Sequence, residues 1–323
     1  MKVNLNIESH IIAFGPVPSR RLGRSLGINN IPVKHCTYSC IYCQVGPTSC
    51  QEIVPREYFT PESVAHAVSQ KVRKVQDHGE EINYLTFVPD GEPTLDINLG
   101  KAIDLLRPLG LKIAVISNAS LLWRSEVREM LNKADWVSLK VDTLDEMLWR
   151  RINQPHSQLQ FSSVLTGIEQ FARNYNGILT TETMLVADVN DSQESITAVS
   201  DFLSGIKPHI AYIAVPIRPP AENNVSIPRE ESIVQAYDIF SAKLKNVELL
   251  TAFEGDVFVS TADPIQDLLA IVAVHPMRKD ALQQFLAKAG LNWDVIQNLI
   301  AQELIKEIHF SDNYFYIRNF KKT

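Results

Sequence analysis

The sequence predicts an α/β protein in which a partial (β/α)6 TIM-like barrel is followed by a small winged-helix domain. Two observations carry this prediction. Between residues 60 and 250, apolar strand patterns alternate with helical patterns at a spacing that requires crossover connections and a parallel sheet. Beyond residue 264 the pattern changes to short helices and a hairpin. We therefore expect a barrel over 1–250, a linker over 251–264 and a winged-helix-like domain over 265–323.

The elements of the predicted barrel follow one another in a regular series. The first helix begins after Thr60, a suitable N-cap, with Pro61 at its first position, and Gly79 ends it. The later strands are predicted at 82–88, 112–116, 136–141, 178–186, 209–215 and 247–250. The helices between them are predicted at 95–106, 125–132, 158–175, 192–204 and 230–244. In barrels of this kind the carboxyl ends of the strands carry the chemistry.

The composition is that of an ordinary globular protein. Hydrophobic residues make up 45% of the 323 residues and the formal net charge is −6, so nothing in the overall balance attracts nucleic acid or an anionic membrane. The segment Met1–Phe14 lacks the basic start and apolar run of a signal peptide, and no stretch is apolar enough for a membrane span. We expect a cytoplasmic protein that does not associate with membranes.

Three of the four cysteines lie in one short loop. Cys36, Cys40 and Cys43 have the spacing C-x3-C-x2-C, which predicts a [4Fe–4S] cluster held by three thiolates, with one iron left open to another ligand. A structural zinc site would need a fourth ligand, for which His35 or Cys50 would be required. We favour the cluster and interpret Cys50 as a bystander. Few cysteines, gathered in this way, indicate a reducing compartment.

A basic segment precedes the cysteine loop. Arg20, Arg21, Arg24 and Lys34 occur with no acidic residue between Phe14 and Cys43, and no strand or helix period is visible over residues 14–30. One interpretation is a solvated basic loop. The other is a set of arginines that line the mouth of the site and hold a carboxylate or phosphate.

The cysteine loop resembles the signature of radical S-adenosylmethionine (SAM) enzymes, in which an aromatic residue, here Tyr42, directly precedes the last cysteine. Gly91 and Glu92 in the segment PDGEPT resemble the Gly-Glu motif of that family, whose backbone contacts the amino group of SAM. Asp90 stands where the family usually has a first glycine. The resemblance also implies polar contacts to SAM from Ser117 and Asn118, although both residue types are common in plain turns.

Charged residues occupy inward positions of the predicted strands. Lys140 and Asp142 alternate on one face of the strand 136–141, and Glu182 lies on a face of the strand 178–186 that should be apolar. We assign Lys140, Glu182 and Arg218 as candidate catalytic residues and Asp142 as a candidate contact to SAM. A structural ion pair is the alternative for the charged residues on the strands.

The resemblance implies reductive cleavage of SAM to a 5′-deoxyadenosyl radical that abstracts hydrogen from a substrate. It also implies an external one-electron donor of the flavodoxin or ferredoxin type. The segment FGPVPSRRLGRSLGI and the attached winged helix resemble uncharacterised iron–sulfur oxidoreductases that are distantly similar to wyosine-type tRNA modification enzymes. The substrate, small molecule or macromolecule, is left open. The alternatives are a nucleic-acid-modifying enzyme that docks its substrate on the C-terminal domain, an electron-transfer protein, and a non-catalytic iron–sulfur regulator that binds DNA.

The charge of the predicted winged helix does not favour DNA binding. Residues 261–323 contain seven Lys or Arg and seven Asp or Glu, and the predicted third helix, 292–303, has no basic residue. Because phosphate neutralisation supplies most nucleic-acid affinity, this balance argues against DNA binding. We expect the domain to cover the barrel or to mediate protein contact, including homo-oligomerisation.

Overall fold

The computed structural model describes residues 11–251, 258 and 263–319, and its main feature is a curled sheet of eight strands. These are β1 (Ala13–Ser19), β2 (Gly23–Ile28), β5 (Tyr84–Phe87), β6 (Lys112–Ser117), β7 (Trp136–Lys140), β8 (Ile178–Met184), β9 (Ile210–Ala214) and β10 (Val247–Leu250). They are hydrogen-bonded in this order across the sheet. All neighbours pair in parallel except β1, which is antiparallel to β2.

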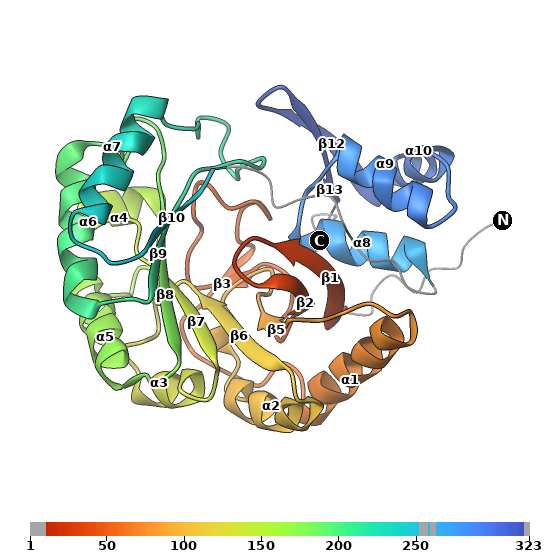
Figure 1. Cartoon of the computed structure of the whole chain (residues 1–323), viewed down its shortest axis with the longest axis horizontal. Coiled ribbons are helices and arrows are strands. Elements are labelled where there is room, and N and C mark those ends of the chain that lie inside the picture. Colours follow the sequence, from red (N-terminus) through yellow and green to blue (C-terminus); the bar gives the residue numbers. More distant parts are fainter. Residues whose placement is uncertain (1–10, 252–257, 259–262, 320–323) are drawn as a thin grey trace.

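Helices connect the parallel strands along the outer side of the curled sheet (Figure 1). They are α1 (Pro61–Asp77), α2 (Leu99–Leu106), α3 (Ser125–Leu131), α4 (Glu146–Ile152), α5 (Phe161–Asn174), α6 (Gln193–Ile206) and α7 (Glu230–Ser241). Six strand–helix units run from β2 to α7, and β10 follows as the last strand. The predicted partial (β/α)6 barrel is therefore confirmed.

Local sequence signals explain where several helices begin. The hydroxyl of Thr60 accepts a hydrogen bond from the backbone N–H of Ser63 (3.2 Å), as expected for an N-cap, and Gly79 takes a positive φ after the end of α1. Helix α2 begins four residues later than predicted. The carboxylate of Asp96 instead accepts from the backbone N–H of Asn98 (2.9 Å), a local bond that favours a turn over a helix.

The basic segment before the cysteine loop forms the hairpin β1–β2, which the sequence did not predict. A bulge between Phe14 and Val17 interrupts the register of the two strands and hides the alternation of buried and exposed positions. Gly27 lies against Phe14, because a Cβ at this glycine would stand 2.0 Å from the ring. At the hairpin turn, Arg20 donates to the carbonyl of Leu249 (2.7 Å), so the turn reaches across to the opposite edge strand β10.

The C-terminal part has the order of elements of a winged helix. Its elements are α8 (Pro264–Val274), β11 (Met277–Arg278), α9 (Lys279–Lys288), α10 (Asp294–Ala301), β12 (Ile305–Phe310) and β13 (Asn313–Arg318). The three strands form an antiparallel sheet in the order β11-β13-β12. This part has a hydrophobic core of its own. The domain boundaries stay a prediction, since most of the expected linker, 252–257 and 259–262, lies outside the described residues.

Helix α8 attaches the C-terminal part to the barrel beside β1 and α1 (Figure 1). Phe14 on β1 packs with Ala270 and Val274 of α8. Lys71 of α1 forms an ion pair with Asp267 of α8, and the two side chains are only 11% and 8% exposed. The attachment therefore combines apolar packing with a buried pair of charges.

We expect Asp267→Asn to weaken this attachment, because it leaves the ammonium group of Lys71 buried without its carboxylate. The expected loss is about 3 kcal/mol of unfolding free energy, measured by urea denaturation together with the rate of proteolysis between barrel and winged helix. Asp280→Asn is the matched control, since Asp280 pairs with Arg278 at 2.7 Å but is 45% exposed. Equal losses in the two variants would contradict a special role of the buried pair.

No helix within the described ranges is long and apolar enough to cross a membrane. The segment predicted to lack a signal peptide falls largely on residues 1–10, which lie outside the described residues.

Candidate active site

A cavity of about 320 Å³ opens at the carboxyl ends of the strands. Its wall combines the hairpin β1–β2, the cysteine loop, the segments after β5 and β9, and the end of α8. The side chains that matter for the argument below are Arg21, Cys36, Cys43, Asp90, Lys140, Glu182 and Arg218. The volume lies in the range of small-molecule sites. This is the location that a barrel of this type predicts for its chemistry.

The three loop cysteines lie at the cavity with amide groups beside them. Cys36 and Cys43 line it, and Cys40, in the same loop, is not one of the lining residues. Asn118 donates from its amide to the sulfur of Cys36, and Asn153 donates to the sulfur of Cys40, both at 3.5 Å. Such donors stabilise thiolates that ligate a metal.

The electrostatics of the loop call for a cationic partner. Burial raises the pKa of Cys36, and the charge of Cys40 raises it further. Burial likewise raises the pKa of Cys40 to about 12 and raises that of Cys43. Three buried thiolates so close together are stable only beside positive charge, which a cationic iron–sulfur core supplies.

The spacing of the three thiols suits a cluster better than a single ion. In the described part of the chain, the three-residue group whose ligand atoms all lie within 4.8 Å of one another is His35, Cys50 and Glu52. The loop thiols do not converge in this way, whereas a zinc ion with bonds of about 2.3 Å would draw its sulfurs closer than that. The donor set therefore fits a polynuclear iron–sulfur group with three thiolate ligands.

The turn after β5 packs directly on the cysteine loop. A Cβ at Gly91 would stand 1.7 Å from the carbonyl oxygen of His35, so only glycine fits here. The backbone N–H of Glu92 donates to the same carbonyl (3.1 Å), and the N–H of Lys34 donates to the carbonyl of Asp90 (2.9 Å). Gly91 lines the cavity, so its backbone is available to a ligand.

The carboxylate of Glu92 is buried and satisfied within the protein. It accepts from the hydroxyl and N–H of Thr94 (2.7 and 3.1 Å), from the hydroxyl of Ser117 (2.8 Å) and from the N–H of Asn118 (2.7 Å). Ser117 and Asn118 were predicted as direct contacts to SAM. In the structure Ser117 holds Glu92 and the amide of Asn118 contacts Cys36, so both support the wall of the site, and direct contact with SAM stays a prediction.

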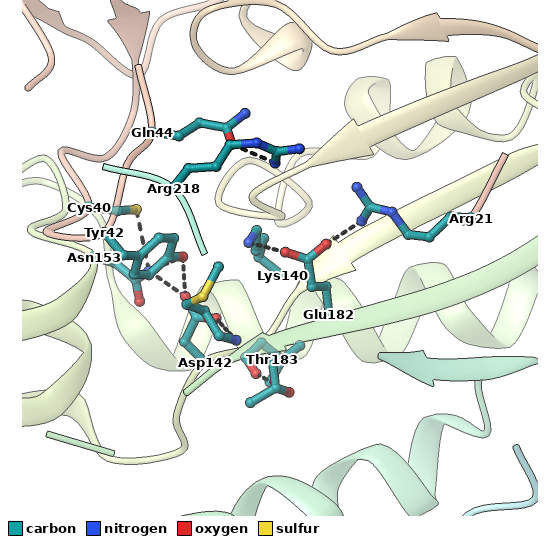
Figure 2. A network of polar contacts seen from close by, with 12 residues as sticks. Arg21, Cys40, Tyr42, Gln44, Lys140, Asp142, Asn153, Glu182, Thr183 and Arg218 are labelled. Atoms are coloured by element: carbon teal, nitrogen blue, oxygen red, sulfur yellow. Dashed lines mark hydrogen bonds and ion pairs between the residues drawn. The ribbon is translucent and has the colours of Figure 1, made fainter. Parts of the chain in front are cut away.

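Asp142 occupies a similar supporting position (Figure 2). Its carboxylate accepts from the hydroxyl of Tyr42, from the amide of Asn153 (2.7 Å) and from the backbone N–H of Met184 (2.9 Å). Asp142 does not line the cavity, whereas the ring of Tyr42 does. A contact between Asp142 and SAM, as the sequence predicted, stays a prediction. The observed role is to link the cysteine loop, the end of β8 and the C-cap residue of α4.

Glu182 bridges two cations inside the cavity (Figure 2). Its two carboxylate oxygens pair with Lys140 and with Arg21. Burial raises the pKa of Glu182, but Lys140 and Arg21 outweigh this effect and hold the pKa at about 2. The ammonium group of Lys140 also lies 5.0 Å from the ring centre of Tyr42. The group carries a net charge of +1 at the cavity wall. The predicted ion pair between charged residues of the strands is therefore observed, between Lys140 and Glu182, and a contact of these residues with a ligand stays a prediction.

Arg218 is oriented by residues from two other parts of the chain. It donates to the side-chain oxygen of Gln44 (3.0 Å) and lies 3.1 Å from Nε2 of His275, at the end of α8. Burial and the charge of Arg218 hold the pKa of His275 well below its usual value, so the neutral imidazole accepts the hydrogen bond. Gln44 in turn donates to the carbonyl of Val274 (3.0 Å). The winged helix thus closes one side of the cavity, as one of the predicted roles requires.

Asp90 is the most unusual charged group of the cavity. It is 3% exposed, and neither carboxylate oxygen has a hydrogen-bond partner among the residues that the structure describes. Burial raises the pKa of Asp90 to about 7, against the weaker opposing effect of Lys34. A buried carboxylate without a partner is expensive, so this geometry suits a cationic group of a bound molecule.

Sequence reasoning missed several residues of the site. Arg21 was named with Arg20 and Arg24 as arginines that could line the mouth of the site, but no feature separated it from these two, which do not line the cavity. Gln44 directly follows Cys43, and this position beside a predicted cluster ligand could have indicated that Gln44 belongs to the site. Asn153 and His275 reach the site from a helix end and from the second domain, and nothing local in the sequence indicates this.

A half-barrel that presents three thiols and a cavity at its carboxyl strand ends defines a class of protein, the enzymes that join an iron–sulfur cluster to a bound nucleoside cofactor. The family model described as "Radical SAM superfamily" matches residues 30–198. The chain belongs to the radical SAM superfamily. It is therefore an enzyme of a family that uses SAM and an iron–sulfur cluster and takes an electron from an external donor, and the predicted family is confirmed.

Relatives agree with this membership. A UPF0026 protein of Methanocaldococcus jannaschii is 43% identical over 312 residues, which are 96% of this chain and 97% of that protein. The fold resembles that of a radical SAM methyltransferase from Sphaerobacter thermophilus, with a TM-score of 0.53 and 14% identity over 71% of this chain and 67% of that chain. TYW1 with a lysine-pyruvate adduct bound aligns over 92% of this chain and 80% of that chain, with 15% identity and a TM-score of 0.46. This similarity is too low to support an argument about function.

Proposed function

We propose that this enzyme reductively cleaves SAM at a [4Fe–4S] cluster held by Cys36, Cys40 and Cys43, and that the resulting 5′-deoxyadenosyl radical removes hydrogen from a substrate in the cavity. The observation that supports this most is the placement of the cysteine loop and the Gly91 turn on one cavity wall. Three thiolates would leave one iron of a cubane open to a further ligand, and Cys36, Cys43 and Gly91 line the cavity in which a cofactor and a substrate would bind.

Different residues of the site would have different roles in this reaction. The amides of Asn118 and Asn153 stabilise two thiolates, which fixes the loop in register with α4 and β6. The backbone of Gly91 at the cavity wall and the unpartnered carboxylate of Asp90 offer acceptors to the ammonium group of SAM. Lys140, Glu182 and Arg218 are the proposed catalytic residues, placed to bind and orient a substrate in the cavity that they line.

The proposal is tested by anaerobic turnover of SAM without a substrate. The reconstituted protein is reduced with dithionite, and 5′-deoxyadenosine and methionine are quantified by mass spectrometry. We expect Cys40→Ala to reduce both products at least about 100-fold, because the cluster loses a ligand. Ser49→Ala, an exposed position of the same loop, is expected to keep the rate of the unaltered protein. Failure of the unaltered protein to release 5′-deoxyadenosine above the level of Cys40→Ala would refute the proposal.

A flavodoxin- or ferredoxin-like protein is the proposed source of the electron. Docking of a nucleic-acid substrate on the C-terminal part is the less favoured alternative, because His275 and Val274 of that part contact Arg218 and Gln44 at the cavity. We therefore favour a substrate that binds inside the cavity, of which the winged helix forms one wall.

A further inference from the structure

A second group of metal-ligating side chains lies outside the cavity, on the short ladder that frames the cysteine loop. Strands β3 (His35–Cys36) and β4 (Cys50–Gln51) pair in parallel, with His35 opposite Cys50. Glu52 follows β4, and its backbone N–H donates to the carbonyl of Cys36 (3.1 Å). None of His35, Cys50 and Glu52 lines the cavity, whereas Cys36 does, so the alternation of the strand turns this group away from the proposed cluster.

The ligand atoms of the group are already close to the spacing that a metal imposes. Nε2 of His35 lies 3.9 Å from Oε1 of Glu52, and Sγ of Cys50 lies 3.8 Å from the same oxygen. A tetrahedral zinc ion with bonds of about 2.0–2.3 Å holds its ligand atoms roughly 3.3–3.8 Å apart. For these two pairs, movements of a few tenths of an ångström would reach that spacing, and Nε2 of His35 and Sγ of Cys50 lie within 4.8 Å of each other.

The surrounding contacts prepare these side chains as ligands. Nδ1 of His35 is 3.2 Å from the carbonyl oxygen of Val33. Because a carbonyl only accepts, Nδ1 must carry the proton, and Nε2 keeps its lone pair for a metal. The hydroxyl of Tyr58 donates to Oε1 of Glu52 (2.6 Å), the same oxygen that faces His35 and Cys50, and so fixes the position of the carboxylate.

One neighbouring charge opposes a cation here. Arg56 donates to Glu52 at 3.0 Å, but its side chain is 54% exposed and its charge is screened by solvent. Cys50, whose thiol donates to Glu52 in this structure, would release its proton to solvent on binding a metal, and the thiolate and the carboxylate would then supply two negative charges to a divalent ion. One nitrogen, one sulfur and one oxygen donor form a mixed set that suits zinc.

We propose that His35, Cys50 and Glu52 form a zinc site with an open fourth position, separate from the iron–sulfur site. A metal bound there would lock β3 to β4 and so fix the base of the cysteine loop. Cys50, interpreted from the sequence as a bystander, is then a ligand. This proposal does not depend on the proposed reaction, since it concerns residues outside the cavity.

The test uses the anaerobically reconstituted full-length protein, incubated with zinc and freed of excess metal. Zinc and iron are counted by mass spectrometry, and X-ray absorption at the zinc edge reports the ligand shell without interference from iron. We expect about one zinc per chain, with one sulfur and otherwise nitrogen and oxygen neighbours. A shell of three sulfurs would mean that zinc has entered the cysteine loop and would overturn the proposal, as would the absence of retained zinc.

Variants make the assignment specific. Cys50→Ala and His35→Gln are each expected to weaken zinc binding at least about 100-fold, and Tyr58→Phe about 10-fold, with the iron content unchanged. Using two ligand variants keeps the test decisive if one of them folds poorly. His156→Gln, a histidine away from the group, is the matched control and should bind zinc normally. Unchanged zinc content and affinity in both ligand variants would overturn the proposal.

Discussion

Glu182→Gln is expected to lower the free energy of unfolding by about 3–5 kcal/mol, because it removes the anion shared by two buried cations. Lys140 and Arg21 each pair with one oxygen of this carboxylate, and Glu182 is 6% exposed. A glutamine has nearly the same shape but only one accepting atom and no charge. The variant therefore leaves two like charges facing each other in a partly dry cavity. Urea unfolding near neutral pH measures the loss.

The effect of Glu182→Gln should depend on pH in a definite direction. The pKa of Glu182 is about 2 in the folded protein, below the usual value near 4.5. A depressed carboxyl pKa contributes stability that is present above the unfolded pKa and is lost as the pH falls through the folded one. The difference between the unaltered protein and the variant should therefore shrink from about pH 4.5 down to about pH 2.

Two further variants separate the buried pair from ordinary surface charge. Glu169→Gln removes a carboxylate that pairs with Arg173 at 3.4 Å on the exposed side of α5, and it should cost less than about 0.5 kcal/mol. Adding Lys140→Met to Glu182→Gln removes one of the stranded cations and should recover part of the loss. A loss in Glu182→Gln no larger than in Glu169→Gln would contradict the bridging role.

The local parts of the site could be predicted from the sequence, because their ligands are neighbours in the chain. Cys36, Cys40 and Cys43 lie within eight residues, so their spacing alone indicates one inorganic centre. The strand period also brought Lys140 and Glu182 to inward positions, and the structure pairs these residues directly across β7 and β8. Alternation and register are properties of a few residues, and a pattern can reveal them.

The remaining parts depend on contacts between distant segments. Arg21 reaches Glu182 only because the bulged hairpin β1–β2 folds over the strand ends, and the bulge conceals the strand period. His275 reaches Arg218 through the packing of α8 against β1, which involves apolar residues with no directional pattern. The sequence explained only in part why position 91 requires a glycine. We expected the backbone of Gly91 to approach a ligand closely. In the structure this glycine also allows close contact with the carbonyl group of His35.

Asp90→Asn is expected to stabilise the folded protein at neutral and alkaline pH, whereas Glu182→Gln destabilises it. The pKa of Asp90 is about 7 in the folded protein, well above the usual value near 3.8, because the carboxyl group is buried without a partner. A raised carboxyl pKa means that the unaltered protein loses stability as the pH rises from about 4 to about 7. The variant lacks this loss and should be about 2–4 kcal/mol more stable at pH 8, with little difference below pH 4.

The comparison needs a control and a functional measurement on the same samples. Asp238→Asn, on the exposed side of α7, should leave the unfolding free energy within about 0.5 kcal/mol at both pH values. If Asp90 accepts a hydrogen bond from the ammonium group of SAM, the more stable Asp90→Asn should need about 10-fold more SAM for half-maximal release of 5′-deoxyadenosine. A variant that is less stable at pH 8 would contradict the unpartnered state of this carboxylate. Unchanged dependence on SAM would contradict the proposed contact between Asp90 and the ammonium group of SAM.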